Sequence, residues 1–412
     1  MSLFRGALAV LLAMSTAVVA VPSQRAEADP SDCTFKPGTA VGDIWPQRRL
    51  DFQQVWGITR GAGVKVAVVD SGVNFINPQL RGIRHETGVS VIPTFDRTTR
   101  DCVGHGTAVA GIIAARPLAD QTFLGVAPDV TIIPIKQTNT KDDKSGQPAG
   151  IAAGIRAAIS AGAQVINISV EVNAPTPDLT AAVAQARAKG RVIVAAAGND
   201  GQQSRAKAYP AAYSTTFDNV IAVSATDSND VVADFANAGG YVTVAAPGKD
   251  VPVPSSLSGY ENAAGTSFAA PYVTGTVALM LAAAAQDPGT SPMTPADVRD
   301  RLEVTADAPP ADVPDPLYGY GIVNPYLAVT TVRDGSVALP RPSKATPLPA
   351  PQAAKPADRA LQHVALGLAF GLIGLTVLTL VAAGILRAGG RRRAGPLPPS
   401  EPDRDRGTLV RR

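Results

Sequence analysis

Three short motifs supply an acid, a base and a hydroxyl group, in that order along the chain. The acid is Asp70, which follows a run of apolar residues and precedes Ser-Gly. The base is His105 in Gly-His-Gly-Thr, and the hydroxyl belongs to Ser267 in Gly-Thr-Ser-Phe-Ala-Ala-Pro. A serine hydroxyl is a weak nucleophile near neutral pH, so it needs a base to accept its proton and an acid to orient that base. These residue types therefore predict hydrolysis through nucleophilic attack by Ser267.

The choice of base follows from the small number of histidines, of which the chain has three. His85 lies in the polar stretch Arg-His-Glu, which is typical of a surface residue. His363 adjoins a long apolar segment that is expected to span a membrane. His105 stands between two glycines at the start of an alanine-rich pattern, where small neighbours allow close approach of a substrate and a tight entry into a helix. A histidine-dependent hydrolase would therefore use His105.

Taken singly, these residues also have plain structural interpretations. Ser267 precedes a helical pattern and is an ordinary helix-capping residue type. Asp70 alone would be a strand-end residue before a turn glycine. The presence of all three motifs in one order favours the catalytic interpretation, and a nucleophile at a helix N-terminus also gains from the positive end of the helix dipole.

The segments that must position these residues alternate between strand and helix patterns. The expected buried strands are residues 64–69, 131–135, 165–170, 192–196 and 220–224. The expected helices are residues 108–115, 149–161 and 179–189, with a further helix starting at the cap Thr294 and Pro295. Nearly continuous apolar strands that alternate with helices predict an α/β fold with a parallel sheet between helices. Ligands of such sheets bind at the carboxyl ends of strands, where Asp70 lies.

The motif set resembles that of the subtilisin-like serine proteases, over about residues 50 to 330. The resemblance implies a subtilisin-like parallel β-sheet flanked by helices and a serine endopeptidase with Asp70, His105 and Ser267 as its catalytic residues. It also makes Asn199, in Ala-Ala-Ala-Gly-Asn, the side-chain donor of the oxyanion hole, together with the backbone N–H of Ser267. An Asn-Asp-Gly turn is the alternative interpretation of Asn199.

The resemblance further implies a substrate-binding set. Its members are Ser169, Val170, Glu171, Ala197, Gly198 and Ala208. Glu171 stands where the family pattern has glycine, and Ala208 stands where glycine is common. We therefore expect substrate to pair as a strand along 169–171, against a narrow first specificity pocket with an acidic wall. The alternative is that Glu171 points to solvent.

The N-terminal residues predict export. Arg5 precedes the apolar stretch 7–20, and Ala26-Glu27-Ala28 offers a small-x-small cleavage site. Residues 1–28 are therefore expected to be a signal peptide, with an uncleaved membrane anchor as the alternative. Residues 29–57 are expected to be a polar extension that wraps the peptidase domain, which is assigned to 58–332.

The C-terminal residues predict one membrane span. Residues 364–386 contain no charged residue, and Arg387 and further arginines follow. This pattern indicates a transmembrane helix over 361–386, although a buried core helix is the alternative. Because positive residues remain on the cytoplasmic side, the catalytic domain is expected to be extracytoplasmic and the basic tail 387–412 cytoplasmic. Residues 333–360, rich in proline and alanine, are expected to be the linker.

The chain has two cysteines, Cys33 and Cys102. An even number in an exported protein makes a disulfide the default, with two unpaired thiols as the alternative. Their spacing does not match a metal site, and no metal or other cofactor is expected. From Arg387 onward there are 8 basic and 3 acidic residues, so the rest of the chain has 29 basic and 31 acidic residues. This balance gives no reason to expect a nucleic-acid partner.

The whole layout resembles that of the mycosins, which are membrane-anchored subtilases of type VII secretion systems. The cysteine before the domain and the one ahead of His105 fit that pattern. A second cysteine pair is missing, and residues 250–264 are short where mycosins can carry a long insertion. The resemblance implies a protein substrate exported by the secretion system, contact with the lipid bilayer through one span, and partners among the secretion membrane components. The alternatives are a mainly structural component of that complex and a general cell-surface subtilase.

Overall fold

The computed structural model describes residues 33, 37–39, 43–92, 97–119, 122–139, 147–204, 206–287, 289 and 291–331. The chain divides into two units, Met1–Thr346 and Pro347–Arg412, and every described residue belongs to the first. The predicted signal peptide, linker, transmembrane helix and tail therefore lie outside the described residues.

The main sheet of the described residues has eight strands in the order β2-β4-β1-β5-β6-β7-β8, with β3 also paired to β4. Its strands are β1 (Lys65–Asp70), β2 (Arg84–His85), β3 (Val89–Ser90), β4 (Thr131–Lys136), β5 (Val165–Ile168), β6 (Val192–Ala196), β7 (Val220–Thr226) and β8 (Val244–Pro247). Every pairing in this sheet is parallel. The predicted α/β class with a parallel sheet is confirmed, and each of the five expected strands is present.

The described helices are α1 (Trp45–Leu50), α2 (Pro78–Arg81), α3 (His105–Ala114), α4 (Pro148–Ser160), α5 (Pro177–Ala188), α6 (Thr266–Ala284), α7 (Pro295–Thr305) and α8 (Pro325–Thr330), with 3-10 turns η2 (Phe52–Gly57) and η4 (Ala211–Thr215). Proline opens several of them, because its missing N–H has no intrahelical partner at that position. The predicted start of α7 is confirmed, since Thr294 and Asp297 form a reciprocal capping box.

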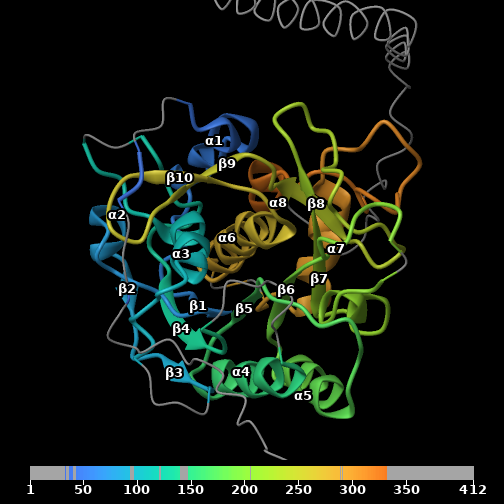
Figure 1. Cartoon of the computed structure of the whole chain (residues 1–412). Helices are drawn as coiled ribbons and strands as arrows, with labels where there is room; N and C mark the ends of the chain where they lie inside the picture. Colours follow the sequence, from blue (N-terminus) through green and yellow to red (C-terminus); the bar gives the residue numbers. More distant parts are fainter. Residues whose placement is uncertain are drawn as a thin grey trace, which may run out of the picture. The chain divides into compact units, whose positions relative to one another are not determined.

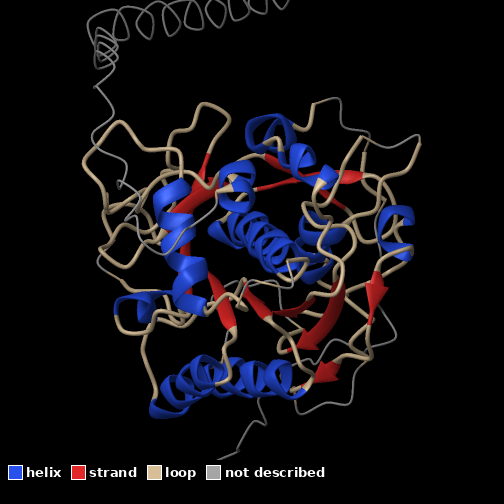
Figure 2. Cartoon of the chain, turned by 180° about the vertical axis from the view of Figure 1, so that it is seen from behind, coloured by secondary structure: helices blue, strands red, loops and turns tan. Residues whose placement is uncertain are grey.

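Helices cover both faces of the sheet. In Figure 1, α3 and α6 lie on one side of the strands, while α4 and α5 lie on the other; Figure 2 shows the same layers from behind. Side chains of β1 alternate accordingly: Val66 and Val68 pack into the core with α3 and α6, and Ala67 and Val69 pack into the core with α4 and α5. This double burial explains why the strand sequences are almost continuously apolar.

Helix α6 runs through the centre of the described unit (Figure 1). It has 19 residues and, among the described residues, is the single helix long and apolar enough to cross a membrane. Because 78% of its apolar window is buried inside the protein, its composition is that of a core helix surrounded by other elements. This placement is what fixes Ser267 at its start.

The segment before β1 contains more regular structure than its polar composition indicated. Helix α1 and turn η2 both fall within residues 29–57, where the sequence shows no clear period. Phe52 and Val55 are fully buried. Further upstream, Thr39 pairs antiparallel with Tyr260 of β10 (Tyr260–Ala263), and β10 pairs with β9 (Val251–Pro254) as a separate two-stranded sheet. The apolar side chains of this segment therefore belong to the main core.

Candidate active site

Asp70 and His105 meet at the carboxyl edge of the main sheet. Asp70 is the last residue of β1, and His105 is the first residue of α3. The Nδ1 atom of His105 lies 2.8 Å and 2.9 Å from the two carboxylate oxygens of Asp70. Asp70 is fully buried, and its Oδ1 also accepts hydrogen bonds from the backbone N–H (2.7 Å) and the hydroxyl (3.1 Å) of Ser71. The carboxylate is thus held where it can orient an imidazole and stabilise its protonated form.

Gly106 allows these two elements to approach closely. A Cβ atom at this position would lie 2.1 Å from the carbonyl oxygen of Gly72 and 3.0 Å from the Cβ of Asp70. The backbone N–H of Gly106 donates to the hydroxyl of Ser71 at 3.1 Å. The sequence suggested that the glycines beside His105 allow substrate approach and a tight entry into the helix. The structure adds a further reason for Gly106, which is its close contact with the loop that carries Asp70.

The hydroxyl of Ser267 is buried at the start of α6. Ser267 is the second residue of α6 and Gly265 is the N-cap, so the interpretation of Ser267 as a capping residue is wrong. Its Oγ has no hydrogen-bond partner in the part of the chain that the structure describes. The ring of Phe268, the next residue, packs with its centroid 5.0 Å from that of the His105 imidazole. The structure therefore brings the acid and the base into contact, and the ring contact of Phe268 brings the helix start that carries the hydroxyl to the same base.

Asn199 lies next to Ser267, on the loop that follows β6. A Cβ atom on Gly265 would lie 2.8 Å from the Oγ of Ser267 and 3.7 Å from the Nδ2 of Asn199, so both atoms border the same point. The Oδ1 of Asn199 accepts hydrogen bonds from Thr266, which leaves the amide N–H groups to donate. An amide donor beside a serine hydroxyl is the arrangement that stabilises an oxyanion.

A buried polar chain ties α6 to the segment after β5. The hydroxyl of Ser169 donates to the carbonyl oxygen of Ser267 at 2.8 Å and accepts from the amide of Asn167 at 2.9 Å. The hydroxyl of Thr274 then donates to Asn167 at 2.8 Å. Asn167 and Thr274 were not among the residues predicted from the sequence. The signal that could have found Asn167 is an asparagine inside an apolar strand, because a buried amide must find partners.

The predicted substrate-binding residues gather around Ala197 and Gly198. Val172 exchanges backbone hydrogen bonds of 3.1 Å and 2.9 Å with Tyr209, which places the 169–171 segment beside Ala208. A Cβ atom on Gly198 would lie 2.9 Å from the Cβ of Ala208. Val170 and Ala208 are both buried. The residues that the sequence assigned to the first specificity pocket therefore pack closely against one another.

Glu171 is 3% exposed, so the alternative in which it points to solvent is wrong. It lies near Tyr241, whose hydroxyl donates to the carbonyl oxygen of Ala197 at 2.8 Å. Burial, with a smaller contribution from the nearby carboxylates of Glu171 and Asp200, raises the pKa of Tyr241 to about 12. A glutamate side chain therefore lies near the Tyr241 phenol behind Ala197, and burial is the main reason why the phenol stays protonated.

Cys33 and Cys102 form a disulfide, with their Cα atoms 5.0 Å apart. The default prediction is confirmed, and the alternative of two free thiols is wrong. The bond joins the extension to the residue three positions before His105. Within the described residues, no group of three or more His, Cys, Asp or Glu side chains is arranged to hold a metal ion.

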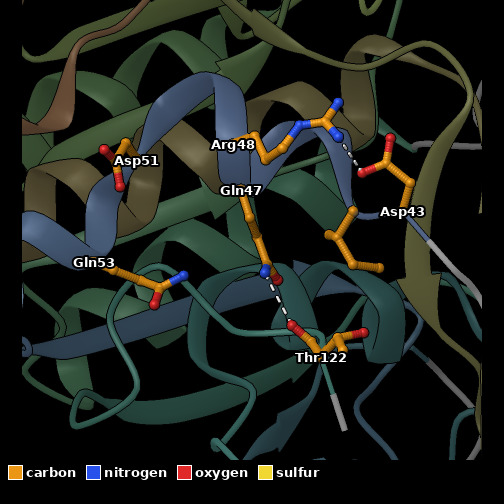
Figure 3. Close-up of a pocket in the computed structure, with 7 residues that line it drawn as sticks. Asp43, Gln47, Arg48, Asp51, Gln53 and Thr122 are labelled. Atoms are coloured by element: carbon orange, nitrogen blue, oxygen red, sulfur yellow. Dashed lines mark hydrogen bonds and ion pairs between the residues drawn. The ribbon is translucent and has the colours of Figure 1, made fainter.

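A pocket of about 240 Å³ lies beside α1 (Figure 3). It is lined by Asp43, Ile44, Gln47, Arg48, Asp51, Gln53 and Thr122. Figure 3 shows the amide of Gln47 donating to the carbonyl oxygen of Thr122 and Arg48 pairing with Asp43. None of the predicted site residues lines this pocket, and its side chains supply no base beside a nucleophile. It is therefore not the candidate site for hydrolysis.

Comparisons with known proteins show the family of this chain. The model of the subtilase family (Peptidase S8) matches residues 61–321. Mycosin-4 of Mycobacterium tuberculosis (strain ATCC 25618 / H37Rv) is 37% identical over 89% of this chain and 87% of its own length. Thermitase of Thermoactinomyces vulgaris is 36% identical over 68% of this chain and 94% of its own length.

Solved structures give the same result. The crystal structure of MycP1 with its N-terminal propeptide removed has a TM-score of 0.62 and 30% identity, and covers 72% of this chain and 99% of that one. The MycP3 protease from the type VII (ESX-3) secretion system has a TM-score of 0.59 and 31% identity, with 72% and 91% covered. The sequence and the fold thus both match those of the subtilases.

Proposed function

Because this chain belongs to the subtilase family and is a subtilisin-like serine endopeptidase, we propose that Asp70, His105 and Ser267 are its catalytic triad. Ser267 attacks the carbonyl carbon of the scissile peptide bond, and His105 accepts the hydroxyl proton. Asp70 holds the imidazole through Nδ1 and stabilises the imidazolium that forms. The observation that carries this assignment is the contact of His105 Nδ1 with both oxygens of the buried Asp70. The ring contact of His105 with Phe268, the residue after Ser267, supports it, because it brings the start of α6 to the base.

The oxyanion of the tetrahedral intermediate is assigned to the amide of Asn199 and the backbone N–H of Ser267. The N-terminal position of Ser267 on α6 supports this role, because the first N–H groups of a helix have no intrahelical partner. His105 then returns its proton to the leaving amine, and water resolves the acyl-enzyme by the same steps.

Substrate selectivity is assigned to the pocket between the 169–171 segment, Gly198 and Ala208. The bulk of Glu171 and the methyl group of Ala208 reduce its volume. The enzyme therefore prefers small residues at the position before the scissile bond and cleaves few sites. What supports this proposal is the burial of both side chains next to the predicted oxyanion loop.

The cellular role is proposed from the relatives. The chain resembles mycosin-4 over most of its length, and its predicted signal peptide and span place the peptidase outside the cytoplasmic membrane. We therefore assign it a protein substrate that is exported by a type VII secretion system.

A second role is structural support of the secretion membrane complex. The observation that favours it is the description of MycP1, 30% identical to this chain, as an essential component of the type VII (ESX-1) secretion system. An essential component can act through contacts alone, so activity and assembly must be tested separately.

The separating experiment is complementation of a deletion strain with wild type or Ser267→Ala at equal membrane levels. Loss of cleavage of an exported protein by Ser267→Ala, with secretion retained, supports proteolysis as the role of the site. Assembly of the secretion complex would then depend on other surfaces of this protein. Unchanged cleavage by Ser267→Ala would rule out the proposed nucleophile.

A further inference from the structure

We propose that Asp101 is a positioning residue for His105, acting through the first turn of α3. The inference rests on the proposed function, because it takes His105 as the catalytic base. Asp101 touches neither Asp70 nor Ser267 in any described contact, and no motif of the sequence analysis includes it. Its contacts nevertheless determine where α3 begins.

Asp101 provides the cap that the sequence at the helix start lacks. The N-cap residue is Gly104, which has no side chain and a φ of 87°. The Oδ1 of Asp101 accepts from the backbone N–H groups of Val103 (3.1 Å) and Gly104 (2.9 Å), while Oδ2 accepts from the N–H (2.8 Å) and hydroxyl (2.6 Å) of Thr107. Four donors and the positive end of the helix dipole compensate this fully buried carboxylate.

Thr107 extends the same contact to the loop that carries the catalytic acid. Its hydroxyl oxygen accepts from the backbone N–H of Asn74 at 2.9 Å. Asn74 lies four positions after Asp70, on the segment leaving β1. One threonine side chain therefore joins the cap of the helix that bears the base to the loop that bears the acid.

The backbone around Asp101 is itself held from two sides. The ammonium group of the buried Lys136, at the end of β4, donates to the carbonyl oxygen of Arg100 at 2.6 Å. On the other side, Cys102 is bonded to Cys33. Lys136 is also the residue paired in register with Asp70 across β1 and β4. The carboxylate is thus anchored to the same sheet edge as the acid, and it cannot follow α3 if the helix shifts.

This arrangement predicts an effect on the chemical step. A displacement of about 1 Å in a catalytic group can lower a rate on the order of 100-fold. Without its cap the first turn of α3 loses the bonds that fix its start, and His105 is the first residue of that turn. A residue with a purely structural role would lower the thermal stability and leave the reactivity of folded molecules unchanged.

The test uses the full-length protein and a fluorophosphonate probe, so no peptide substrate is needed. Asp101→Asn is compared with Asp297→Asn, which makes the same chemical change in the cap of α7. For Asp101→Asn we expect kinact to fall about 10- to 100-fold with KI changed by less than about two-fold. For Asp297→Asn we expect a lower melting temperature with unchanged kinact. Equal kinact for Asp101→Asn and wild type, per folded molecule, would overturn the proposal.

A second pair of variants covers the case in which Asp101→Asn does not fold. Thr107→Val removes the hydroxyl but keeps the shape of the side chain, whereas Thr107→Ser keeps the hydroxyl. The proposal expects Thr107→Val to lose far more kinact than Thr107→Ser, and equal losses contradict it. Wild type that is not labelled at Ser267 would instead refute the proposed function, so the two failures are distinguishable.

Discussion

The side-chain oxygen of Asn199 accepts two hydrogen bonds from Thr266, one from the backbone N–H at 2.9 Å and one from the hydroxyl at 3.1 Å. Thr266 is the residue directly before Ser267, so the amide of Asn199 is oriented by the same turn that carries the nucleophile. The hydroxyl of Thr266 also accepts from the backbone N–H of Gly198 at 3.1 Å. The loop after β6 and the start of α6 therefore form one rigid unit, with the amide N–H groups of Asn199 left to donate.

This orientation predicts the effect of Asn199→Asp. The variant keeps an oxygen for Thr266 but replaces the proposed oxyanion donor with a negative group. We expect kcat to fall about 100- to 1,000-fold with little change in KM, because the lost interaction is made mainly in the transition state. The measurement is steady-state hydrolysis of a peptide anilide. Asn229→Asp, the same change at an exposed turn residue, serves as the control and should match wild type. A larger change in KM than in kcat would assign Asn199 to substrate binding.

The burial of Glu171 predicts how the cleavage profile responds to mutation. Glu171→Gly removes the side chain from the pocket wall, so we expect cleavage of peptides with large apolar residues before the scissile bond to rise at least about ten-fold. Glu171→Gln keeps the volume and removes the charge, so it should retain the preference for small residues. Profiling with a peptide library measures both. A wild-type profile dominated by large aromatic residues would contradict the narrow pocket.

Tyr241 predicts a pH dependence of stability. Its pKa is about 12 in the folded protein and 10.0 as the reference value, because burial disfavours the phenolate. Between pH 10 and 12 the unfolded chain therefore releases this proton first, and the free energy of unfolding falls as pH rises, by about 2–3 kcal/mol over the whole interval.

Tyr241→Phe has no proton to lose, so its stability should decline less between pH 9 and 11. Urea unfolding of both proteins at the two pH values measures the difference. Phe also leaves the Ala197 carbonyl without its donor, which lowers stability at every pH by about 1–3 kcal/mol. Parallel declines of the two proteins with pH would show that the phenol ionises normally.

The disulfide predicts a loss of stability on removal. Cys33 and Cys102 are 69 positions apart, and closing a loop of that length stabilises a folded protein by about 4 kcal/mol in the chain-entropy model. The double variant Cys33→Ser, Cys102→Ser should therefore unfold at lower urea concentration than wild type. Wild type treated with reductant should approach the variant. Coincident unfolding curves for oxidised wild type and the variant would contradict this role.

The proposed catalytic residues stand out in the sequence because each lies in a short motif at the end or the start of a strand or helix. Asp70 ends an apolar strand, His105 opens a helix between glycines, and Ser267 is the second residue of the longest apolar helix among the described residues. The order of strands and helices followed from apolar runs that are buried on both faces. These patterns are local, so they can be recognised in the sequence without knowledge of tertiary contacts.

Other parts depend on contacts that the sequence does not display. Strand β9 contains Pro252 and Pro254, which remove two backbone donors, so its sequence does not indicate a strand. Among the described strands β9 pairs only with β10, and a strand that pairs on one side tolerates proline. Asp101 was not among the residues predicted from the sequence, although an acid just before a helix start is a known signal. Its importance comes from Thr107 and Asn74, which only the folded chain brings to it.

The central claim is that Ser267 is the nucleophile of an assembled triad. The most direct measurement treats the full-length protein in detergent with a fluorophosphonate and maps the labelled peptide by mass spectrometry, with Ser267→Ala and Asp70→Asn in parallel. We predict stoichiometric labelling at Ser267 in wild type, none at this position in Ser267→Ala, and labelling at least about 100-fold slower in Asp70→Asn. Labelling that persists in Ser267→Ala at another serine, or folded wild type that is not labelled, would contradict the account.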